Sequence, residues 1–397
     1  MKIKLLLSAL LLSAMIKAQN VWTAKANYPG AGRHAAVGFV VGTKAYVGTG
    51  TDDVIFFNNF WEYDQGTNTW TGKANLPAAS RREAVAFSIG TDGFMGMGCC
   101  GAMSDFWKYN TATNTWSAIA TYPGGPTMTG IAFAIGGMGY VGLGDDGSPT
   151  FTKKIFQYNP TTNTWTPKSN FPGVGRTDAL GFAMNGKGYV AIGDDGSGPF
   201  LQDLWEYDPT GDTWTAKANF PGGPRSTAVG FTFPATGKLY IGTGDDNTSF
   251  YNDFWEWNSA TNTWTTVTNF PGGLRTDETG FTIGNKGYVA LGQIGAPPEF
   301  NDLWEFGPVS SNITEKEIES PVVISPNPNN GEFNLYTRSN IESGEINLYN
   351  SLGQLLHSQK IETGPNHIVS SGISEGLYYY FILQKGQQIG NGKIIIK

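Results

Sequence analysis

Residues 253–267 read DFWEWNSATNTWTTV, and the two aromatic segments of this stretch decide the fold of the chain. Residues 253–257 are rich in aromatic side chains, which favour β-strands. Residues 263–267 predict a second strand, and the polar residues between the two segments predict a short loop. The stretch is therefore expected to form a β-hairpin.

The hairpin is one copy of an internal repeat. Asn-Thr-Trp or Asp-Thr-Trp recurs at steps of 46 to 50 residues and ends at Trp70, Trp116, Trp165, Trp214 and Trp264. An aromatic segment precedes each copy, and it is degenerate in the third unit, at residues 154–158. The fifth unit contains four predicted strands, at residues 225–233, 238–242, 253–257 and 263–267. One such sheet cannot bury both apolar faces, so the repeat predicts an all-β propeller with tryptophans filling the space between blades.

The two ends of the repeat region predict six blades. The last unit begins at Arg275 and contains three strands before Gly307. Residues 21–27 match residues 213–219, which belong to a fourth strand. We therefore expect residues 20–27 to complete the sixth blade, in a propeller that spans residues 19–306.

The units resemble kelch repeats over residues 20–306. The matching features are a second strand that ends in Tyr-Val-Gly or Tyr-Ile-Gly, the Asp-x-Trp-x-Tyr strand, and the Thr-x-Trp start of the fourth strand. The sequence departs from the family after the second strand, where Gly-x-Gly or Gly-Asp-Asp replaces a pair of glycines. The resemblance implies a six-bladed propeller and leaves the subgroup open.

The tail differs from the repeats in composition. Residues 307–320 are polar and are predicted to be a linker, and residues 321–397 show short alternating strands typical of a small β-sandwich. This segment resembles the type A sorting domain of the type IX secretion system, through residues 325–328, 348–354, 376–378 and 392–397. The resemblance implies the type IX machinery as a partner, a cell-surface or secreted location, and a source in the Bacteroidetes.

The other end of the chain predicts export. Residues 1–18 combine basic Lys2 and Lys4 with an apolar run too short to span a bilayer comfortably, and are predicted to be a signal peptide. No other apolar run could span a membrane. The chain has 26 Lys and Arg against 33 Asp and Glu, and this acidic balance argues against a nucleic-acid partner.

A candidate ligand-binding face lies where the first strands begin. Five of six units carry Arg there, and the repeated position has two interpretations: a structural tie between blades, or a ring of guanidinium groups that grips anionic or polyhydroxyl ligands. The resemblance adds that arginines at this position bind ligands in some kelch proteins. Residues that do not repeat are better functional candidates. The candidate face comprises Arg33, His34, Arg81, Arg82, Glu83, Arg176, Asp178, Arg225, Arg275, Asp277 and Glu278.

Two further features lie at the same end of the blades. Four units end the second strand with paired acids, at residues 52–53, 145–146, 194–195 and 245–246. These pairs suit turn capping better than Ca²⁺, because the spaced Asp-x-Asp-x-Asp pattern is missing. Cys99 and Cys100 replace the pair in the second blade, as a strained vicinal disulfide or as two thiols; zinc is not expected without a nearby His.

The functional alternatives remain open from the sequence. The chain has three His, two of them in the tail, so a Ser-His-Asp site or a copper site is not expected, and no metal or cofactor is predicted. A propeller that binds carbohydrate or protein is the first hypothesis. The second is an enzyme of the sialic-acid epimerase type, which catalyses sugar mutarotation and could use Glu83, Asp178 or Asp277 as acid or base. The third is a structural surface component.

Overall fold

The computed structural model describes residues 20–308 except 100, 102 and 296, and residues 322–397 except 338–340, 342, 351–353, 371 and 386. The predicted signal peptide, most of the predicted linker and Cys100 lie outside the described residues. The chain divides into two compact units, the first ending at Val309 and the second beginning at Ser310.

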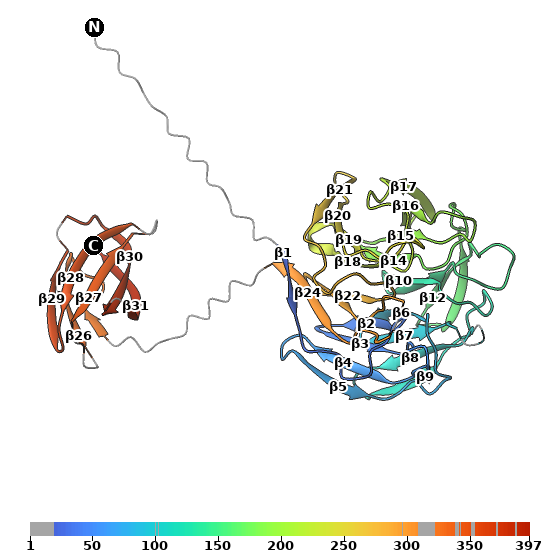
Figure 1. The fold of residues 1–397 in the computed structure, drawn as a ribbon, viewed down its shortest axis with the longest axis horizontal. Coiled ribbons are helices and arrows are strands. Elements are labelled where there is room, and N and C mark those ends of the chain that lie inside the picture. Colours follow the sequence, from blue (N-terminus) through green and yellow to red (C-terminus); the bar gives the residue numbers. More distant parts are fainter. Residues whose placement is uncertain are drawn as a thin grey trace, which may run out of the picture. The chain divides into compact units, whose positions relative to one another are not determined.

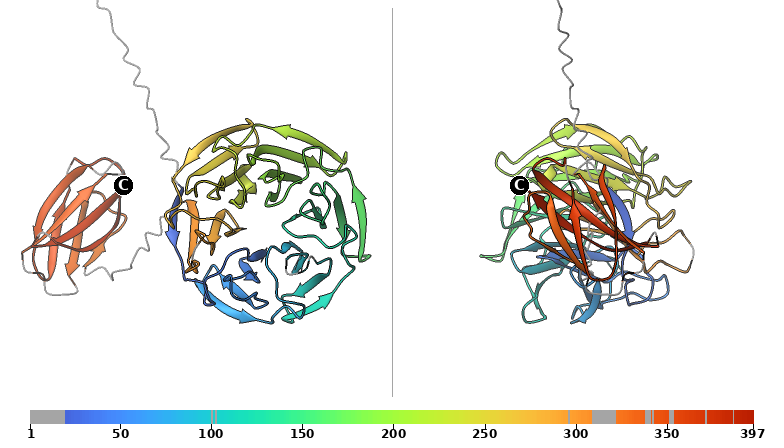
Figure 2. Two further views of the ribbon diagram at one scale, coloured as in Figure 1. Left: turned by 45° about the vertical axis from the view of Figure 1, so that its right-hand side comes forward. Right: turned by 90° about the vertical axis from the view of Figure 1, so that its left-hand side faces the viewer.

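Within residues 20–308, the described residues form six four-stranded antiparallel sheets around a central axis (Figure 1, Figure 2). The strands of the first three blades are β2 (Val37–Val41), β3 (Lys44–Gly48), β4 (Phe60–Asp64) and β5 (Thr69–Lys73); β6 (Val85–Ile89), β7 (Asp92–Gly96), β8 (Phe106–Asn110) and β9 (Thr115–Ala118); and β10 (Ile131–Ile135), β11 (Met138–Gly142), β12 (Ile155–Asn159) and β13 (Thr164–Lys168).

The remaining blades follow the same order, with the first strand innermost. The fourth and fifth contain β14 (Leu180–Met184), β15 (Lys187–Gly193), β16 (Leu201–Asp208) and β17 (Thr213–Lys217); and β18 (Val229–Phe233), β19 (Lys238–Gly242), β20 (Phe254–Asn258) and β21 (Thr263–Val267). A short 3₁₀ helix, η1 (Pro234–Thr236), joins β18 to β19. The sixth contains β22 (Thr279–Ile283), β23 (Lys286–Ala290), β24 (Leu303–Pro308) and β1 (Asn20–Ala24). The predicted all-β propeller is thus confirmed.

The Asn-x-Trp or Asp-x-Trp motif holds each of the first five blades to the preceding one. In the sixth, Trp22 donates to the carbonyl of Thr268, whereas Asn20 donates to Tyr240. In the first blade, Asn68 Oδ1 accepts from the backbone N–H of Ala26 at 3.0 Å, and Trp70 Nε1 donates to the carbonyl of the same Ala26 at 2.8 Å. Asn68 has a φ of 54°, a left-handed conformation that Asn adopts more readily than most residues. The same grip recurs on Ala74, Ala120, Ser169 and Ala218. The repeat is therefore an interblade clamp, defined here as the Asn (or Asp) and Trp side chains that hold one residue's N–H and C=O.

A second ring of contacts joins the blades near the axis. Gly50 donates its N–H to the carbonyl of Arg81 in the next blade at 2.8 Å. Gly50 has a φ of 86°, and a Cβ atom there would lie 2.7 Å from the carbonyl oxygen of His34, so the position requires glycine. Equivalent bonds join Gly98 to Thr127, Gly144 to Arg176, Gly193 to Arg225, Gly244 to Arg275 and Gly292 to Arg33. The last bond closes the ring between the sixth blade and the first.

The first strand of the chain completes the sixth blade. β1 pairs with β24 from Asn20 opposite Pro308 to Ala24 opposite Trp304. β24 therefore includes Gly307 and Pro308, which the sequence assigned to the linker; they remain in the sheet because β1 offers them a partner. Trp22 inserts among aromatic side chains of the fifth and sixth blades, with ring centroids 5.0 Å from Phe254 and 4.8 Å from Phe306.

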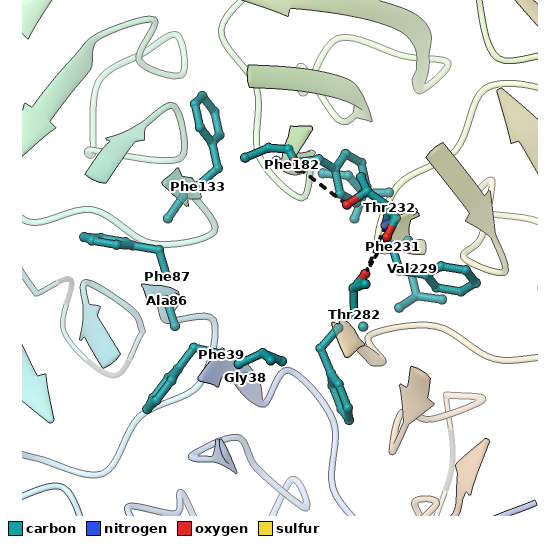
Figure 3. Close-up of a pocket in the computed structure, with 18 of the residues that line it drawn as sticks. Gly38, Phe39, Ala86, Phe87, Phe133, Phe182, Val229, Phe231, Thr232 and Thr282 are labelled. Carbon is teal, nitrogen blue, oxygen red and sulfur yellow. Dashed lines mark hydrogen bonds between the residues drawn. The ribbon is translucent and has the colours of Figure 1, made fainter. Parts of the chain in front are cut away.

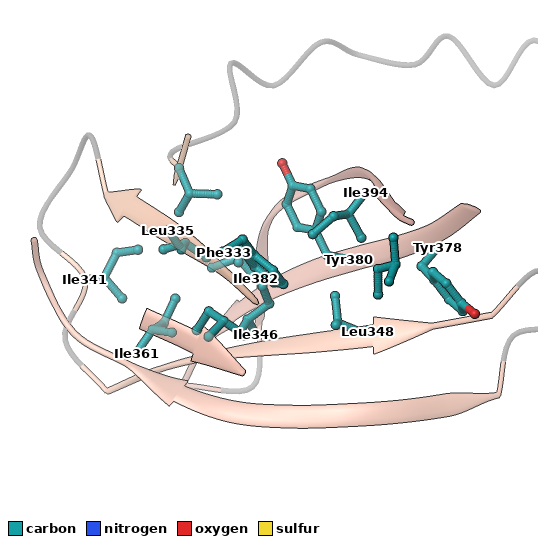
Figure 4. Close-up of a cluster of buried hydrophobic side chains, with 13 residues drawn as sticks. Phe333, Leu335, Ile341, Ile346, Leu348, Ile361, Tyr378, Tyr380, Ile382 and Ile394 are labelled. Carbon is teal, nitrogen blue, oxygen red and sulfur yellow. The ribbon is translucent and has the colours of Figure 1, made fainter. Parts of the chain in front are cut away.

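The C-terminal unit contains two sheets. One has the order β25 (Val322–Ser325), β26 (Glu332–Thr337) and β29 (Pro365–Val369); the other has the order β28 (Leu355–Ile361), β27 (Gly344–Tyr349), β30 (Gly376–Gln384) and β31 (Gln387–Ile396). Side chains of both sheets form one buried cluster, which includes Phe333 and Leu335 from one sheet and Ile346, Leu348 and Ile382 from the other (Figure 4). The predicted small β-sandwich is confirmed.

Replacing Trp22 tests the closure of the ring. Trp22→Ala should lower the free energy of unfolding by about 2–4 kcal/mol, because it removes an interblade aromatic ring that is partly buried. The readout is urea denaturation followed by tryptophan fluorescence, since all 12 tryptophans of the chain lie between residues 22 and 304. Trp264→Ala, at the equivalent place in the fifth blade, should cost a similar amount; an unchanged midpoint for Trp22→Ala would contradict closure by β1.

Candidate functional site

The five arginines of the repeated series, which excludes Arg82, are buried inside their own blades. Arg176 donates to both carboxylate oxygens of Asp203, at 2.5 and 2.8 Å, and to the carbonyl of Ile192 at 2.9 Å. The other pairs are Arg33 with Asn59, Arg81 with Asp105, Arg225 with Asp253 and Arg275 with Asp302. All five side chains are 0–1% exposed. These contacts favour the structural interpretation of the series. The guanidinium groups link the start of the first strand to the start of the third strand of one blade, and the backbone carbonyls of the same residues join neighbouring blades.

The channel mouth is formed by the residues two positions after this series. They are Ala35, Glu83, Thr129, Asp178, Thr227 and Asp277, and each has a left-handed φ between 49° and 59°. Because this conformation occurs in every blade, it belongs to the fold, and only the side chains differ. They surround a cavity of about 160 Å³ whose walls include Glu278. We call this cavity the mouth.

A larger cavity lies along the axis below the mouth. It measures about 360 Å³, is lined by the first strands of all six blades, and shares Leu180, Ala228 and Glu278 with the mouth. Phe39, Phe87 and Phe133 point away from its open centre, so small residues such as Gly38 and Ala86 line the channel (Figure 3). The mouth therefore leads into a hollow channel and is not a flat surface.

Four carboxyl groups converge at the mouth, and their surroundings favour the protonated form. Burial, with the nearby charges of Asp277 and Glu83, raises the pKa of Asp178 to about 7. Burial raises the pKa of Glu278 to about 8 although Arg275 opposes the change, and burial also raises the pKa of Glu83 and of Asp277. At neutral pH the mouth thus offers both proton donors and proton acceptors.

Polar side chains of the sixth and first blades fix one side of the mouth. His34 is 3% exposed and lies with Nε2 3.0 Å from Asp53 and Nδ1 3.2 Å from Gln293 Nε2. Gln293 also donates to Asp277 at 3.0 Å. In the adjoining second blade, Arg82 Nε lies 3.1 Å from Glu83 Oε1. Of the six non-repeated candidates, Glu83, Asp178, Asp277 and Glu278 line the mouth. Arg82 and His34 lie behind it, against Glu83 and Asp277 respectively.

Sequence reasoning missed two members of this group. Gln293 occupies, in the sixth blade, the place of the first paired acid, and an alignment on the preceding glycine would have revealed it. Thr227 donates to Asp245 at 2.7 Å, which turns this paired acid toward the mouth. Thr227 was missed because threonine is common in this sequence and does not by itself indicate a functional site.

The paired acids cap turns. Asp52 Oδ1 accepts from the N–H groups of Val54 and Ile55, and Asp146 Oδ1 accepts from that of Ser148. Asp145, Asp194, Asp195, Asp245 and Asp246 make equivalent bonds. In the first blade the aligned pair is Thr51 and Asp52, because Thr51 makes the backbone bridge that Asp145, Asp194 and Asp245 make elsewhere. Asp53 is an additional residue, which reaches His34.

The cysteine pair is described in part. Cys99 forms the equivalent backbone bridge with Arg82, so it occupies the place of Asp145 and Asp194. Its neighbour Cys100 is not among the described residues, and the vicinal disulfide stays a prediction. Across the described residues, no group of three or more His, Cys, Asp or Glu side chains has the arrangement of a metal site.

Comparison with known proteins separates the two units. Residues 323–397 match the family of secretion system C-terminal sorting domains, so the chain carries a signal for export to the cell surface or for secretion. The propeller is similar to a solved structure titled "Structure of YjhT", with a TM-score of 0.60 and 17% identity, over 70% of this chain and 95% of that one. This likeness shows the fold alone. No curated protein matches the chain, and no described helix has the length and apolarity of a membrane span.

The raised pKa values predict how stability changes with pH. In the unfolded chain Asp178 titrates near its ordinary pKa of about 4, whereas in the folded protein its pKa is about 7. Between these two pH values the folded state holds a proton on Asp178 that the unfolded state releases. The contribution of this group to the free energy of unfolding is therefore fully present below about pH 4 and is lost as the pH rises through about 7. Asp178→Asn should reduce the loss of melting temperature between pH 5 and pH 8 by about 2 °C or more, measured by tryptophan fluorescence.

Asp195→Asn is the matched control, because this acid caps a turn of the same blade outside the mouth. It should leave the pH dependence as in the wild type. Equal slopes for the wild type and Asp178→Asn would show that the mouth does not retain this proton.

Proposed function

We propose that the exported propeller binds a small uncharged sugar at the mouth. The observation that carries this proposal is the convergence of Glu83, Asp178, Asp277 and Glu278 from three blades on one cavity that continues into the channel. The nearby basic side chains Arg82, His34 and Arg275 each already face an acid. Those carboxyl groups of the mouth that are ionised repel anionic ligands, and the protonated ones offer donors to neutral ligands.

The hydrogen-bonding needs of the mouth support a polyhydroxyl ligand. Glu278 Oε2 accepts from Thr243 Oγ1 at 3.1 Å, whereas its Oε1 is buried without a hydrogen-bond partner among the described residues. A buried oxygen left in this state is costly, and a ligand hydroxyl supplies the missing partner. Carboxyl groups in mixed protonation states can both donate to hydroxyls and accept from them.

A glycan array with the mature chain tests this proposal, followed by calorimetric titration with free glucose, galactose, mannose and N-acetylneuraminic acid. Neutral sugars should bind and the anionic sugar should not. Glu278→Gln and Asp178→Asn should weaken binding of the best neutral sugar by about tenfold each, because each loses a hydrogen bond to a charged or shared-proton group. Preference for N-acetylneuraminic acid, or full affinity in both variants, would contradict the proposal.

A second candidate function, mutarotation of a neutral sugar, is favoured by the pKa values of about 7 and about 8. Interconversion of anomers requires one group to take the proton of the anomeric hydroxyl and another to protonate the ring oxygen. Asp178 and Glu278 hold these states near neutral pH, where acid–base catalysis is most effective. The kelch resemblance includes enzymes of the sialic-acid epimerase type, but the charge of this mouth favours an uncharged substrate.

Mutarotation can be measured by polarimetry or by proton NMR exchange between anomers of glucose and galactose. A catalytic mouth should accelerate equilibration above the buffer rate, with a maximum near neutral pH, and Asp178→Asn should lower the rate by about 10²-fold or more. Turnover of a free sugar would replace the binding function by the enzymatic one. Binding without any acceleration would exclude catalysis on that sugar.

A further inference from the structure

The third blade departs from the other five at three linked positions. Thr127 stands where the others have the buried Arg, and Lys154 stands where they have the Asp or Asn that pairs with it. Thr152 stands where they have a large apolar residue, namely Phe57, Met103, Leu201, Tyr251 or Phe300. Loss of one charge alone would leave its partner buried and unpaired, so the two changes belong together. The third blade has therefore given up the internal ion pair that the fold uses elsewhere.

At the two pair positions, Thr127 stays buried, whereas Lys154 turns toward the surface. Lys154 is 51% exposed, and its Nζ lies 3.3 Å from Asp146 Oδ2 in the turn after β11. Asp146 is 8% exposed, and its bonds to Ser148 and Lys154 outweigh burial and lower its pKa. Where other blades have a buried pair formed by Arg, the third blade thus has an ion pair at the surface between Lys154 and Asp146, which we call the polar wall.

This wall borders a cavity of about 620 Å³. Its sides are the β11–β12 connection of the third blade, the β13–β14 connection, and residues 195–197 of the fourth blade. None of its lining residues lines the mouth. We call this cavity the rim pocket; its volume lies within the range of small-ligand sites.

The chemistry of the rim pocket is polar but balanced in charge. Two lysines, Lys153 and Lys154, face two acids, Asp146 and Asp195, so the lining has no net charge. The other polar groups are hydroxyls and one amide, from Ser148, Thr150, Thr152, Ser197 and Asn170. Such a lining offers both donors and acceptors and selects neither anions nor cations.

One aromatic ring completes the pocket. Phe151 lines the cavity and lies beside Gly196 of the fourth blade, where a Cβ atom would be 3.3 Å from the ring. Gly196 therefore lets the ring lie close to the neighbouring backbone. An aromatic surface surrounded by hydroxyl and amide groups provides apolar contact for the C–H face of a pyranose and hydrogen bonds for its hydroxyls.

We propose that the rim pocket between the third and fourth blades is a second ligand site, separate from the mouth, that takes an uncharged oligosaccharide. The volume, the cancelled charge and the single aromatic surface support this class together. The proposal does not depend on the mouth, because the two cavities share no residue.

Saturation-transfer NMR and calorimetry with the mature chain test the site, using maltotetraose, cellotetraose, xylotetraose and N-acetylchitotetraose as probes. At least one should bind, and Phe151→Ala should weaken it by about tenfold through loss of the aromatic contact. Phe250→Ala is the matched control: Phe250 lies beside Gly295 of the next blade as Phe151 lies beside Gly196, but it lines no part of the rim pocket. It should leave affinity within about twofold.

A second variant tests the origin of the pocket. The double change Thr127→Arg with Lys154→Asp restores the pair of the other blades, so it should preserve the urea midpoint and weaken oligosaccharide binding. Asp178→Asn should leave this binding unchanged, which separates the rim pocket from the mouth. The proposal is overturned if none of the four probes binds, if Phe250→Ala weakens binding as much as Phe151→Ala, or if a poly-glutamate or poly-lysine peptide binds the pocket in place of the sugars.

Discussion

The grip of each hairpin on one residue of the preceding blade organises the whole propeller. Asn68 and Trp70 together satisfy the N–H and the C=O of Ala26, and the same side chains do so in four further blades. A single backbone unit held at both its donor and its acceptor cannot slide along its neighbour, so the clamp fixes both spacing and register. The inner bonds from Gly50 and its equivalents then hold the blades at the axis. The mouth lies inside this doubly tied ring.

The side chains that repeat in the blades thus make contacts within the propeller. The residue type differs between blades at the positions that lie between them. Arg176 is buried, and its guanidinium donates to Asp203 and to the carbonyl of Ile192 inside the blade. Two residues later the chain faces the axis, and there the six blades carry four different side chains. The third blade adds a different kind of variation, since it gives up the buried pair itself. Both candidate sites therefore arise where the six copies differ.

Much of the fold could be predicted from the sequence, because the Trp spacing and the match of residues 21–27 to residues 213–219 reflect contacts that every blade repeats. The members of the mouth were also foreseeable as the acids that break the repeat. The direction of the Arg side chains was not, because a periodic Arg looks the same whether it points inward to Asp203 or outward to solvent. The rim pocket depends on exchanges at residues 127, 152 and 154 and on residues of the next blade, and the cavity that they border appears only in the structure.

The pairing of β1 with β24 has a consequence for the order of folding. Of the propeller strands, β1 is synthesised first and β24 last. β1 can therefore pair only after the rest of the propeller has been made, since Asn20 pairs with Pro308. Until then the aromatic surface that receives Trp22, including Phe254 and Phe306, stays uncovered at the open end of the ring. During synthesis the propeller therefore remains an open arc until its last blade has emerged, and residues 323–397, the sorting domain, emerge after closure becomes feasible.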